Sequence, residues 1–301
     1  MMNDSSILLE SGTNELEIVE FGIGQNKFAI NVMKVKEILN PVPVVVIPNA
    51  HPFVEGIMEL RGEVLPVINV AAALGLKEST NPQLDKFIVA EFNQIKTVFH
   101  VHAVSQIHRI SWSQIEKPSD MYQGQESQII GVIKLGGEMV LFLDFEKILL
   151  EINPESGIKV SDVKKLGPRE RSMKRIVIAE DSAMLRKMLH DTLSEAGFQY
   201  LEFFENGHDA ITYLEQLAVD ADVFSESVQL VITDIEMPQM DGHHLTKRIK
   251  EHSVLQKLPV IIFSSLITNE LRHKGSVVGA DAQISKPEIS ELVLKIDELI
   301  L

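Results

Sequence analysis

Five residues in the second half of the chain carry side chains that bind metal ions or phosphate. Glu180 and Asp181 directly follow one short apolar run, and Asp234 follows another. Two later apolar runs end at Ser264 and at Lys286. Carboxylate oxygens are preferred ligands of Mg2+ and can attack phosphorus, while a hydroxyl and an ammonium can hydrogen-bond phosphoryl oxygens. Together these residue types could move a phosphoryl group onto a carboxylate.

The elements that would bring these residues together alternate regularly between strand and helix. Apolar strand-like runs and amphipathic helix-like runs form five β/α units, which predicts a flavodoxin-like, doubly wound parallel sheet with helices on both faces. The carboxyl ends of parallel strands share one edge of the sheet. At that edge Asp181 and Asp234 would bind Mg2+, and Glu180 would orient a bound water. Asp234 would be the nucleophile, with Ser264 and Lys286 on the phosphoryl oxygens.

Each residue taken alone has an ordinary structural explanation. An aspartate after a strand commonly caps the next helix, and a lysine before a proline is commonly solvated. Five such residues at corresponding strand ends favour the functional interpretation. A phosphotransferase of the haloacid dehalogenase type is disfavoured, because its second acid is an aspartate two residues after the nucleophile and this chain has Glu236 there.

The same segments resemble the receiver domain of two-component response regulators. The matching stretches are Ala179–Ser182, Thr233–Gly242, Phe263–Ser265 and Ser285–Pro287. The resemblance implies that a partner histidine kinase phosphorylates Asp234, and that Glu180, Asp181 and the main-chain carbonyl of Glu236 hold Mg2+. Two features depart from the family. Gln283 stands where an aromatic residue usually reports phosphorylation, which predicts a weakened or differently built switch. Val219–Val228 is longer than usual and is expected to form a surface excursion.

The first half of the chain has a different pattern. Short β-like runs separated by tight turns predict an all-β barrel or sandwich, interrupted by brief helices at Met33–Leu39 and Asp144–Leu150. His100 and His102 alternate along one run and so share a strand face. No acid or cysteine stands beside them at the spacing of a metal site, so an ordinary sheet surface is preferred over a metal site. No catalytic motif is evident, and an enzyme is not expected here.

The stretch Glu59–Asn69, which contains Arg61-Gly62 and Pro66-Val67, is similar to the signature of the CheW-like coupling domain of bacterial chemotaxis. The similarity covers about residues 14–151 and implies two small five-stranded barrels that dock onto a chemoreceptor tip and the histidine kinase CheA. It places the receptor-facing positions at Val35, Glu37, Gly56 and Arg61. For Glu37 and Arg61 the alternative is a salt bridge within the domain.

A coupling domain (14–151), a linker (152–174) and a receiver (175–301) together resemble the CheV family. The resemblance implies a cytoplasmic adaptor, recruited to receptor arrays, that couples chemoreceptors to CheA and is regulated by phosphorylation of Asp234. The alternative is a phosphate sink that drains phosphoryl groups from the kinase. In neither case is the chain an enzyme in the usual sense, although its receiver could slowly lose phosphate.

The composition agrees with these assignments. The chain has 301 residues, enough for two domains of ordinary size, and no cysteine for disulfides or thiolate metal sites. A formal charge of −15 argues against nucleic acid as a partner and against a transcription factor. No apolar run reaches the ~18 residues that a transmembrane helix needs, so direct membrane insertion is not expected.

Overall fold

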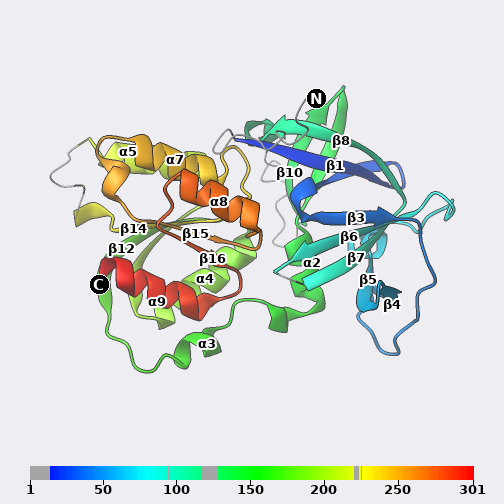
Figure 1. Cartoon of the computed structure of the whole chain (residues 1–301), viewed down its shortest axis with the longest axis horizontal. Coiled ribbons are helices and arrows are strands. Elements are labelled where there is room, and N and C mark those ends of the chain that lie inside the picture. The colour runs from blue at the N-terminus through cyan, green and yellow to red at the C-terminus, as the bar shows by residue number, and fades with distance from the viewer. Residues whose placement is uncertain (1–13, 94, 117–127, 220–223, 225) are drawn as a thin grey trace, which may run out of the picture. The chain divides into compact units, whose positions relative to one another are not determined.

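The computed structural model describes residues 14–301 except 94, 117–127, 220–223 and 225. Contacts divide the chain into two units (Figure 1). The N-terminal unit contains Leu16–Ile110 and Gln114–Ser156, and the C-terminal unit is built on Gly157–Leu301. None of the helices within the described ranges is both long and apolar enough to cross a membrane.

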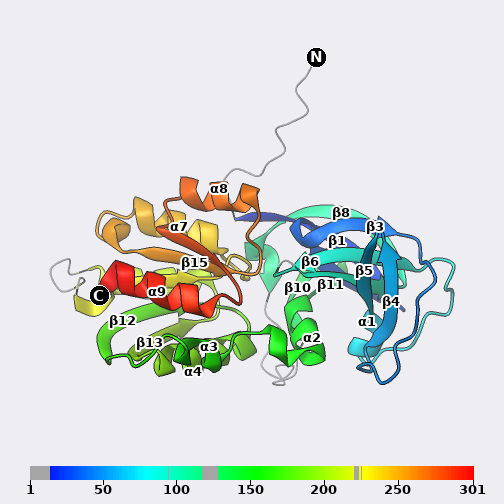
Figure 2. The same ribbon diagram turned by 60° about the horizontal axis from the view of Figure 1, so that its bottom comes forward.

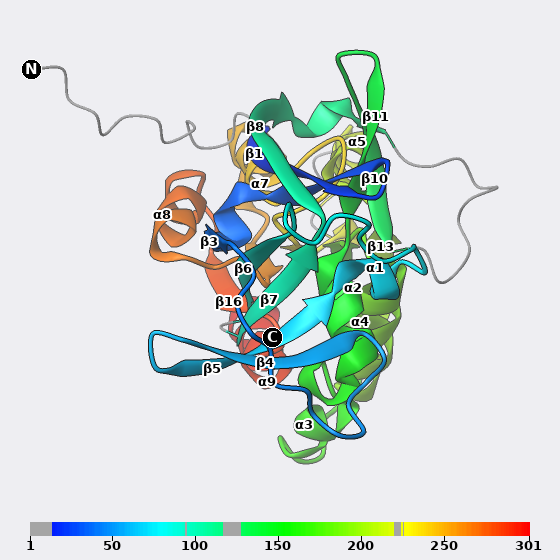
Figure 3. The ribbon, with the colours of Figure 1, turned by 90° about the vertical axis from the view of Figure 1, so that its right-hand side faces the viewer.

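The N-terminal unit consists of two sheets, which Figure 3 shows from another side. The first has the order β8-β1-β2-β11-β10-β9 and the second β3-β6-β7-β5-β4. The strands of the first are β1 (Glu15–Ile23), β2 (Asn26–Asn31), β8 (Ala103–Ser111), β9 (Ile115–Glu116), β10 (Ile129–Leu135) and β11 (Glu138–Leu143). Those of the second are β3 (Val35–Leu39), β4 (Val54–Leu60), β5 (Glu63–Asn69), β6 (Lys86–Phe92) and β7 (Ile95–Val101). The all-β prediction is therefore confirmed.

Two short helices complete the N-terminal unit, α1 (Val70–Ala73) and α2 (Phe145–Ile152). Phe145 of α2 packs against the rings of Phe21, Phe92 and Phe99 in the core. The prediction of a helix at Met33–Leu39 is wrong for Val35–Leu39, and only Met33 and Lys34 belong to a helical turn. A 3-10 turn ends at Lys34, and β3 follows because Val35–Leu39 pairs antiparallel with β6.

The C-terminal unit has one sheet of five parallel strands in the order β13-β12-β14-β15-β16, as predicted. The strands are β12 (Ser172–Ala179), β13 (Phe198–Phe204), β14 (Leu230–Thr233), β15 (Val260–Ser264) and β16 (Ala282–Ser285). The helices are α4 (Ala183–Glu195), α5 (Gly207–Leu217), α7 (Gly242–Glu251), α8 (Asn269–Val277) and α9 (Ile289–Ile300). Figures 1 and 2 show α4 and α9 on one face of the sheet and α5, α7 and α8 on the other. Residues 220–223 and 225 of the expected surface excursion at Val219–Val228 lie outside the described residues, and of its described residues Phe224 and Val228 are buried in the core.

Four helices of this unit begin at a polar residue whose side chain accepts a hydrogen bond from a main-chain N–H in the first turn. These caps are Ser182 for α4, Asn206 for α5, Asp241 for α7 and Thr268 for α8. Such caps satisfy N–H groups that have no partner inside the helix. They fix where each helix starts, and so they fix the short segments between strand and helix that carry the predicted site.

A short helix, α3 (Val160–Lys164), packs against α4 and α9, as Figure 2 shows. Ile158 and Val163 are buried there. The Ser290 hydroxyl donates to the carbonyl of Asp162, and Arg169 bonds both the carbonyl of Ala196 and the carboxylate of Asp297. Part of the segment that the sequence assigns to the linker thus lies on the C-terminal unit.

Candidate phosphoryl-transfer site

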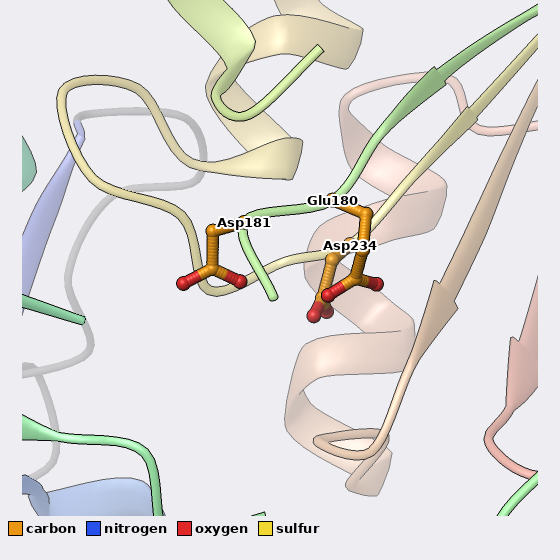
Figure 4. A group of neighbouring side chains, drawn as sticks. All are labelled: Glu180, Asp181 and Asp234. Atoms are coloured by element: carbon orange, nitrogen blue, oxygen red, sulfur yellow. The ribbon is translucent and has the colours of Figure 1, made fainter. Parts of the chain in front are cut away.

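Three acidic side chains meet at the carboxyl edge of the parallel sheet. Glu180 and Asp181 follow β12, and Asp234 follows the neighbouring β14. One carboxylate oxygen from each lies within 4.8 Å of the others. Figure 4 shows Glu180 and Asp234 side by side, with Asp181 beside them. Glu180 is 2% exposed and Asp234 6%, so the cluster lies largely out of water.

A single lysine joins two of these acids. The Nζ of Lys286 donates to Glu180 Oε2 and to Asp234 Oδ2, both at 2.7 Å. Lys286 follows β16 and is 3% exposed, so its ammonium depends on the two carboxylates for much of its solvation. A buried ammonium at this position would hydrogen-bond a phosphoryl oxygen once a phosphoryl group is attached to Asp234.

Ser264 ends β15, the strand between β14 and β16, and is fully buried. It pairs with Ser285, the residue before Lys286. Its Oγ accepts a hydrogen bond from the main chain of Leu266 at 3.2 Å, which ties the hydroxyl to the start of the loop that leads into α8. The hydroxyl therefore stands at the same edge as Asp234 and Lys286.

The main chain around Asp234 is held tightly. Asp234 Oδ1 accepts a hydrogen bond from the N–H of Ile235 at 2.6 Å, and the hydroxyl of Thr233 donates to the carbonyl of Asp234 at 2.8 Å. A Cβ at Gly242 would lie 1.9 Å from that carbonyl oxygen, so only glycine fits there. Glu236 is buried in the same loop, two residues beyond Asp234. The loop thus places a fixed carboxylate oxygen at the site.

The residues present suit a magnesium ion. Three carboxylates and one ammonium leave the site with an excess of negative charge, and the carboxylate oxygens are hard ligands of the kind that Mg2+ prefers. Receiver domains generally bind Mg2+ through an acidic cluster, and this unit has an acidic cluster at the edge of its sheet. Asp181, which is only half-buried, gives the cluster a side open to water.

Gln283 lies on β16, three residues before Lys286. Its side chain extends to α8, where Nε2 donates to the carbonyl of Arg272 at 2.8 Å. Gln283, predicted to stand at the switch position, therefore contacts a helix on the face of the sheet, outside the acidic cluster.

The four positions predicted to face a receptor lie on the five-stranded sheet of the N-terminal unit. Val35 and Glu37 are on β3, Gly56 is on β4, and Arg61 is in the turn after β4. Arg61 Nη2 lies 2.8 Å from Glu37 Oε2, so the alternative of a salt bridge within the domain is realised. Because β3 and β4 are the two outer strands, this pair draws the sheet edges together. Gly56 is buried, and a Cβ there would lie 2.2 Å from the carbonyl oxygen of Val45.

An ionic cluster around His100 was missed by the sequence prediction. Its Nδ1 lies 2.7 Å from Glu55 Oε1 and its Nε2 lies 3.0 Å from Asp85 Oδ2. Burial lowers the pKa of His100, but the two carboxylates outweigh burial and raise the pKa above its ordinary value. The acids are on β4 and just before β6, far away in sequence, so no local spacing could have revealed them. The two ring nitrogens face different acids, so the three side chains form an ion cluster.

Comparisons with known proteins cover both units. The model of the CheW-like domain matches residues 17–153, and that of the response regulator receiver domain matches residues 176–297. The chain is 30% identical to chemotaxis protein CheV3 of Helicobacter pylori, over 95% of each chain. It is 29% identical to chemotaxis protein CheW of Thermotoga maritima, over 50% of this chain and 98% of that protein. The solved structure of chemotaxis response regulator CheY4 of Vibrio cholerae covers 43% of this chain and 100% of its own, with 25% identity and a TM-score of 0.36.

Proposed function

Because this chain belongs to the CheV family of chemotaxis proteins, in which a CheW-like domain is joined to a receiver domain, we propose that it couples chemoreceptors to the histidine kinase CheA and that phosphorylation of Asp234 regulates this coupling. One observation carries the regulatory part. The buried Lys286 ammonium bonds both Glu180 and Asp234 at the edge of the sheet. An ammonium that already bonds Asp234 is placed to bond a phosphoryl oxygen attached to that residue.

In the proposed reaction an oxygen of Asp234 forms a bond to phosphorus as the bond between phosphorus and the donor's leaving group breaks. The N–H of Ile235 holds Asp234 Oδ1, which keeps the carboxylate in one orientation. Lys286 then exchanges its contact with Asp234 Oδ2 for a contact with a phosphoryl oxygen, and the Ser264 hydroxyl donates to another. Bound Mg2+, held by Glu180, Asp181, Asp234 and the carbonyl of Glu236, would offset the charge of the phosphoryl oxygens.

The coupling part of the proposal rests on the CheW-like domain. Its receptor-facing surface would include Val35, Glu37 and Arg61, with Gly56 shaping β4 through its close approach to Val45. Glu37 and Arg61 form an ion pair of which the arginine side chain is 79% exposed, so a partner could reach the guanidinium. Binding to a receptor tip and to CheA would bring the chain to receptor arrays.

The test is sedimentation of the full chain with receptor-containing membranes and CheA, together with the kinase output. Wild type is compared with Asp234→Asn, each in Mg2+ with and without beryllofluoride, and Asp191→Asn serves as a control because Asp191 is an exposed acid of the same unit. Beryllofluoride should change sedimentation or output for wild type and the control only, by about fivefold or more. If it changes neither in wild type while labelled Asp234 loses phosphate rapidly, the phosphate-sink function replaces this one.

A further inference from the structure

The side chain of Gln283 is inserted against α8. Its Nε2 donates to the carbonyl of Arg272 at 2.8 Å and to the Ser276 hydroxyl at 3.3 Å. These two partners stand one helical turn apart, so one amide group bonds two successive turns of α8. We refer to Gln283 with Arg272, Gly275 and Ser276 as the Gln283 clasp.

Gly275 makes room for this amide. A Cβ at position 275 would lie 2.2 Å from Gln283 Oε1 and 2.4 Å from its Cδ, distances at which the glutamine would have to leave. Glycine inside a helix is less favourable than alanine. The chain thus gives up helix stability at the residue that admits Gln283, and departures of this kind are expected at functional positions.

The clasp is incompletely satisfied. Gln283 Oε1 is buried and, within the described part of the chain, has no hydrogen-bond partner. A buried acceptor without a partner is costly, whereas an amide in water is fully hydrogen-bonded. When the Gln283 side chain leaves α8, its Oε1 can form hydrogen bonds to water. This gain lowers the net free energy needed to separate Gln283 from α8.

The clasp joins two segments that both leave the phosphoryl-transfer site. Gln283 lies on β16, which leads directly to Lys286, and α8 is joined to Ser264 by the loop 265–268. Thr268 caps α8 at the end of that loop, so a shift of Ser264 reaches the helix through a few residues. Movement of either Lys286 or Ser264 toward a phosphoryl group would act on one side of the clasp.

We propose that Gln283 is a positioning residue that holds α8 against β16 in the unphosphorylated chain and releases it when the phosphoryl group on Asp234 draws in Ser264 and Lys286. The inference rests on the proposed phosphorylation of Asp234. In this proposal the Gln283 amide reports phosphorylation by separating from α8. An aromatic ring at this position would lack both the two hydrogen bonds to α8 and the buried acceptor without a partner.

The test is hydrogen exchange of the α8 amides in the full chain in Mg2+, with and without beryllofluoride. In wild type, beryllofluoride should speed exchange about fivefold or more. In Gln283→Ala, exchange should be fast from the start, and beryllofluoride should add less than about twofold. Labelling of Asp234 by acetyl phosphate is measured in parallel in each variant.

Gly275→Ala is a matched control, because it should change the hydrogen-exchange rate of α8 in opposite directions in two backgrounds. In the wild-type background it should speed exchange in α8, because the new methyl group expels Gln283. In the Gln283→Ala background it should slow exchange about fivefold, since alanine is the better helix former. A structural role of Gly275 unrelated to Gln283 would give the same sign in both backgrounds.

Two results would overturn the inference. One is α8 exchange in Gln283→Ala equal to that of wild type, and the other is a full beryllofluoride response in that variant. If wild type is labelled at Asp234 but its α8 does not respond, this inference alone fails. If wild type is not labelled at all, the proposed function fails first.

Discussion

The two units differ in how the charges of their buried side chains are balanced. In the N-terminal unit each buried charged residue among those described lies beside an opposite charge. The pairs are Glu20 with Lys27 and His108, Lys34 with Glu146, and Asp85 with His100. In the C-terminal unit one lysine faces a cluster of three carboxylates. Buried pairs join separate segments of the fold, whereas an excess of one charge raises the free energy of the folded state and persists where binding or chemistry needs it.

The largest expected effect is on phosphoryl labelling, which tests whether the carboxylate cluster takes part in phosphoryl transfer. Asp234→Asn removes the nucleophilic carboxylate but keeps its shape, so labelling of the full chain by acetyl phosphate or by a phosphorylated kinase should fall to background. The control Asp191→Asn removes an exposed acid of α4 and should be labelled like wild type. Labelling of Asp234→Asn at the wild-type rate would show that the nucleophile is another residue.

The next effect compares the removal of one acid from each unit, without Mg2+. Asp85→Ala leaves His100 and Ser79 without their shared partner and should lower the free energy of unfolding by about 3 kcal/mol. Asp181→Ala relieves repulsion among the carboxylates of the cluster. The free energy of unfolding should therefore stay unchanged or rise by about 0.5–1 kcal/mol.

Urea unfolding, followed separately for each unit, measures both changes. Calorimetry should also show weakened Mg2+ binding in Asp181→Ala, and added Mg2+ should stabilise only chains that keep Asp181. Unchanged Mg2+ affinity would remove Asp181 from the metal site, and a stable Asp85→Ala would mean that the paired charges of the first unit contribute little.

A third effect uses pH. The carboxylates of Glu55 and Asp85 raise the pKa of His100 against burial, so its stabilising contribution is present below the ordinary histidine pKa and is lost as pH rises through the raised value. Burial lowers the pKa of His243, against the opposing charge of Asp241, so its contribution is present above the ordinary value and is lost as pH falls through the lowered one.

Lowering the pH from about 8 to 6 should therefore increase the contribution of His100 to the stability of the N-terminal unit, offset in part by His102, whose pKa is lowered by burial. The same change should decrease the contribution of His243 to the stability of the C-terminal unit. Hydrogen exchange of core amides in each unit of the full chain follows both at once. His100→Gln should flatten the first dependence and His243→Leu the second. The same pH trend in both units would contradict the difference between a paired histidine and a buried one.

The smallest effect concerns the exposed pair. Arg61→Ala removes one mostly exposed ion pair and should cost less than about 1 kcal/mol. The exchange variant Glu37→Arg with Arg61→Glu should restore that stability. It should not restore receptor binding if the partner recognises a negative charge at position 37 and a positive charge at position 61. Recovery of both properties would reduce the pair to a structural role.

The sequence predicted the parallel sheet and the residues at its edge because these depend on local patterns. Glu180 and Asp181 follow one apolar strand and Asp234 follows another, and Ser182, directly after Asp181, caps the next helix. The region Met33–Leu39 was mispredicted because its pairing with β6 decides its structure.

Contacts between distant segments could not be predicted from local patterns. His100 meets Glu55 and Asp85 only after three separate segments have come together. Gln283 was noticed by its residue type alone, and its role depends on the space that Gly275 leaves in another helix.

The packing of α3 on α4 and α9 also bears on how such chains can be recombined. A receiver cut at residue 175 would lose the bonds of Arg169 to Ala196 and Asp297 and would uncover the side chains that Ile158 and Val163 contact. The piece that can be exchanged between proteins as an intact block therefore begins near Gly157. Gene fusions that join another module at that position keep the receiver's own lead-in segment, whereas a junction at the first strand would separate the block from part of its fold.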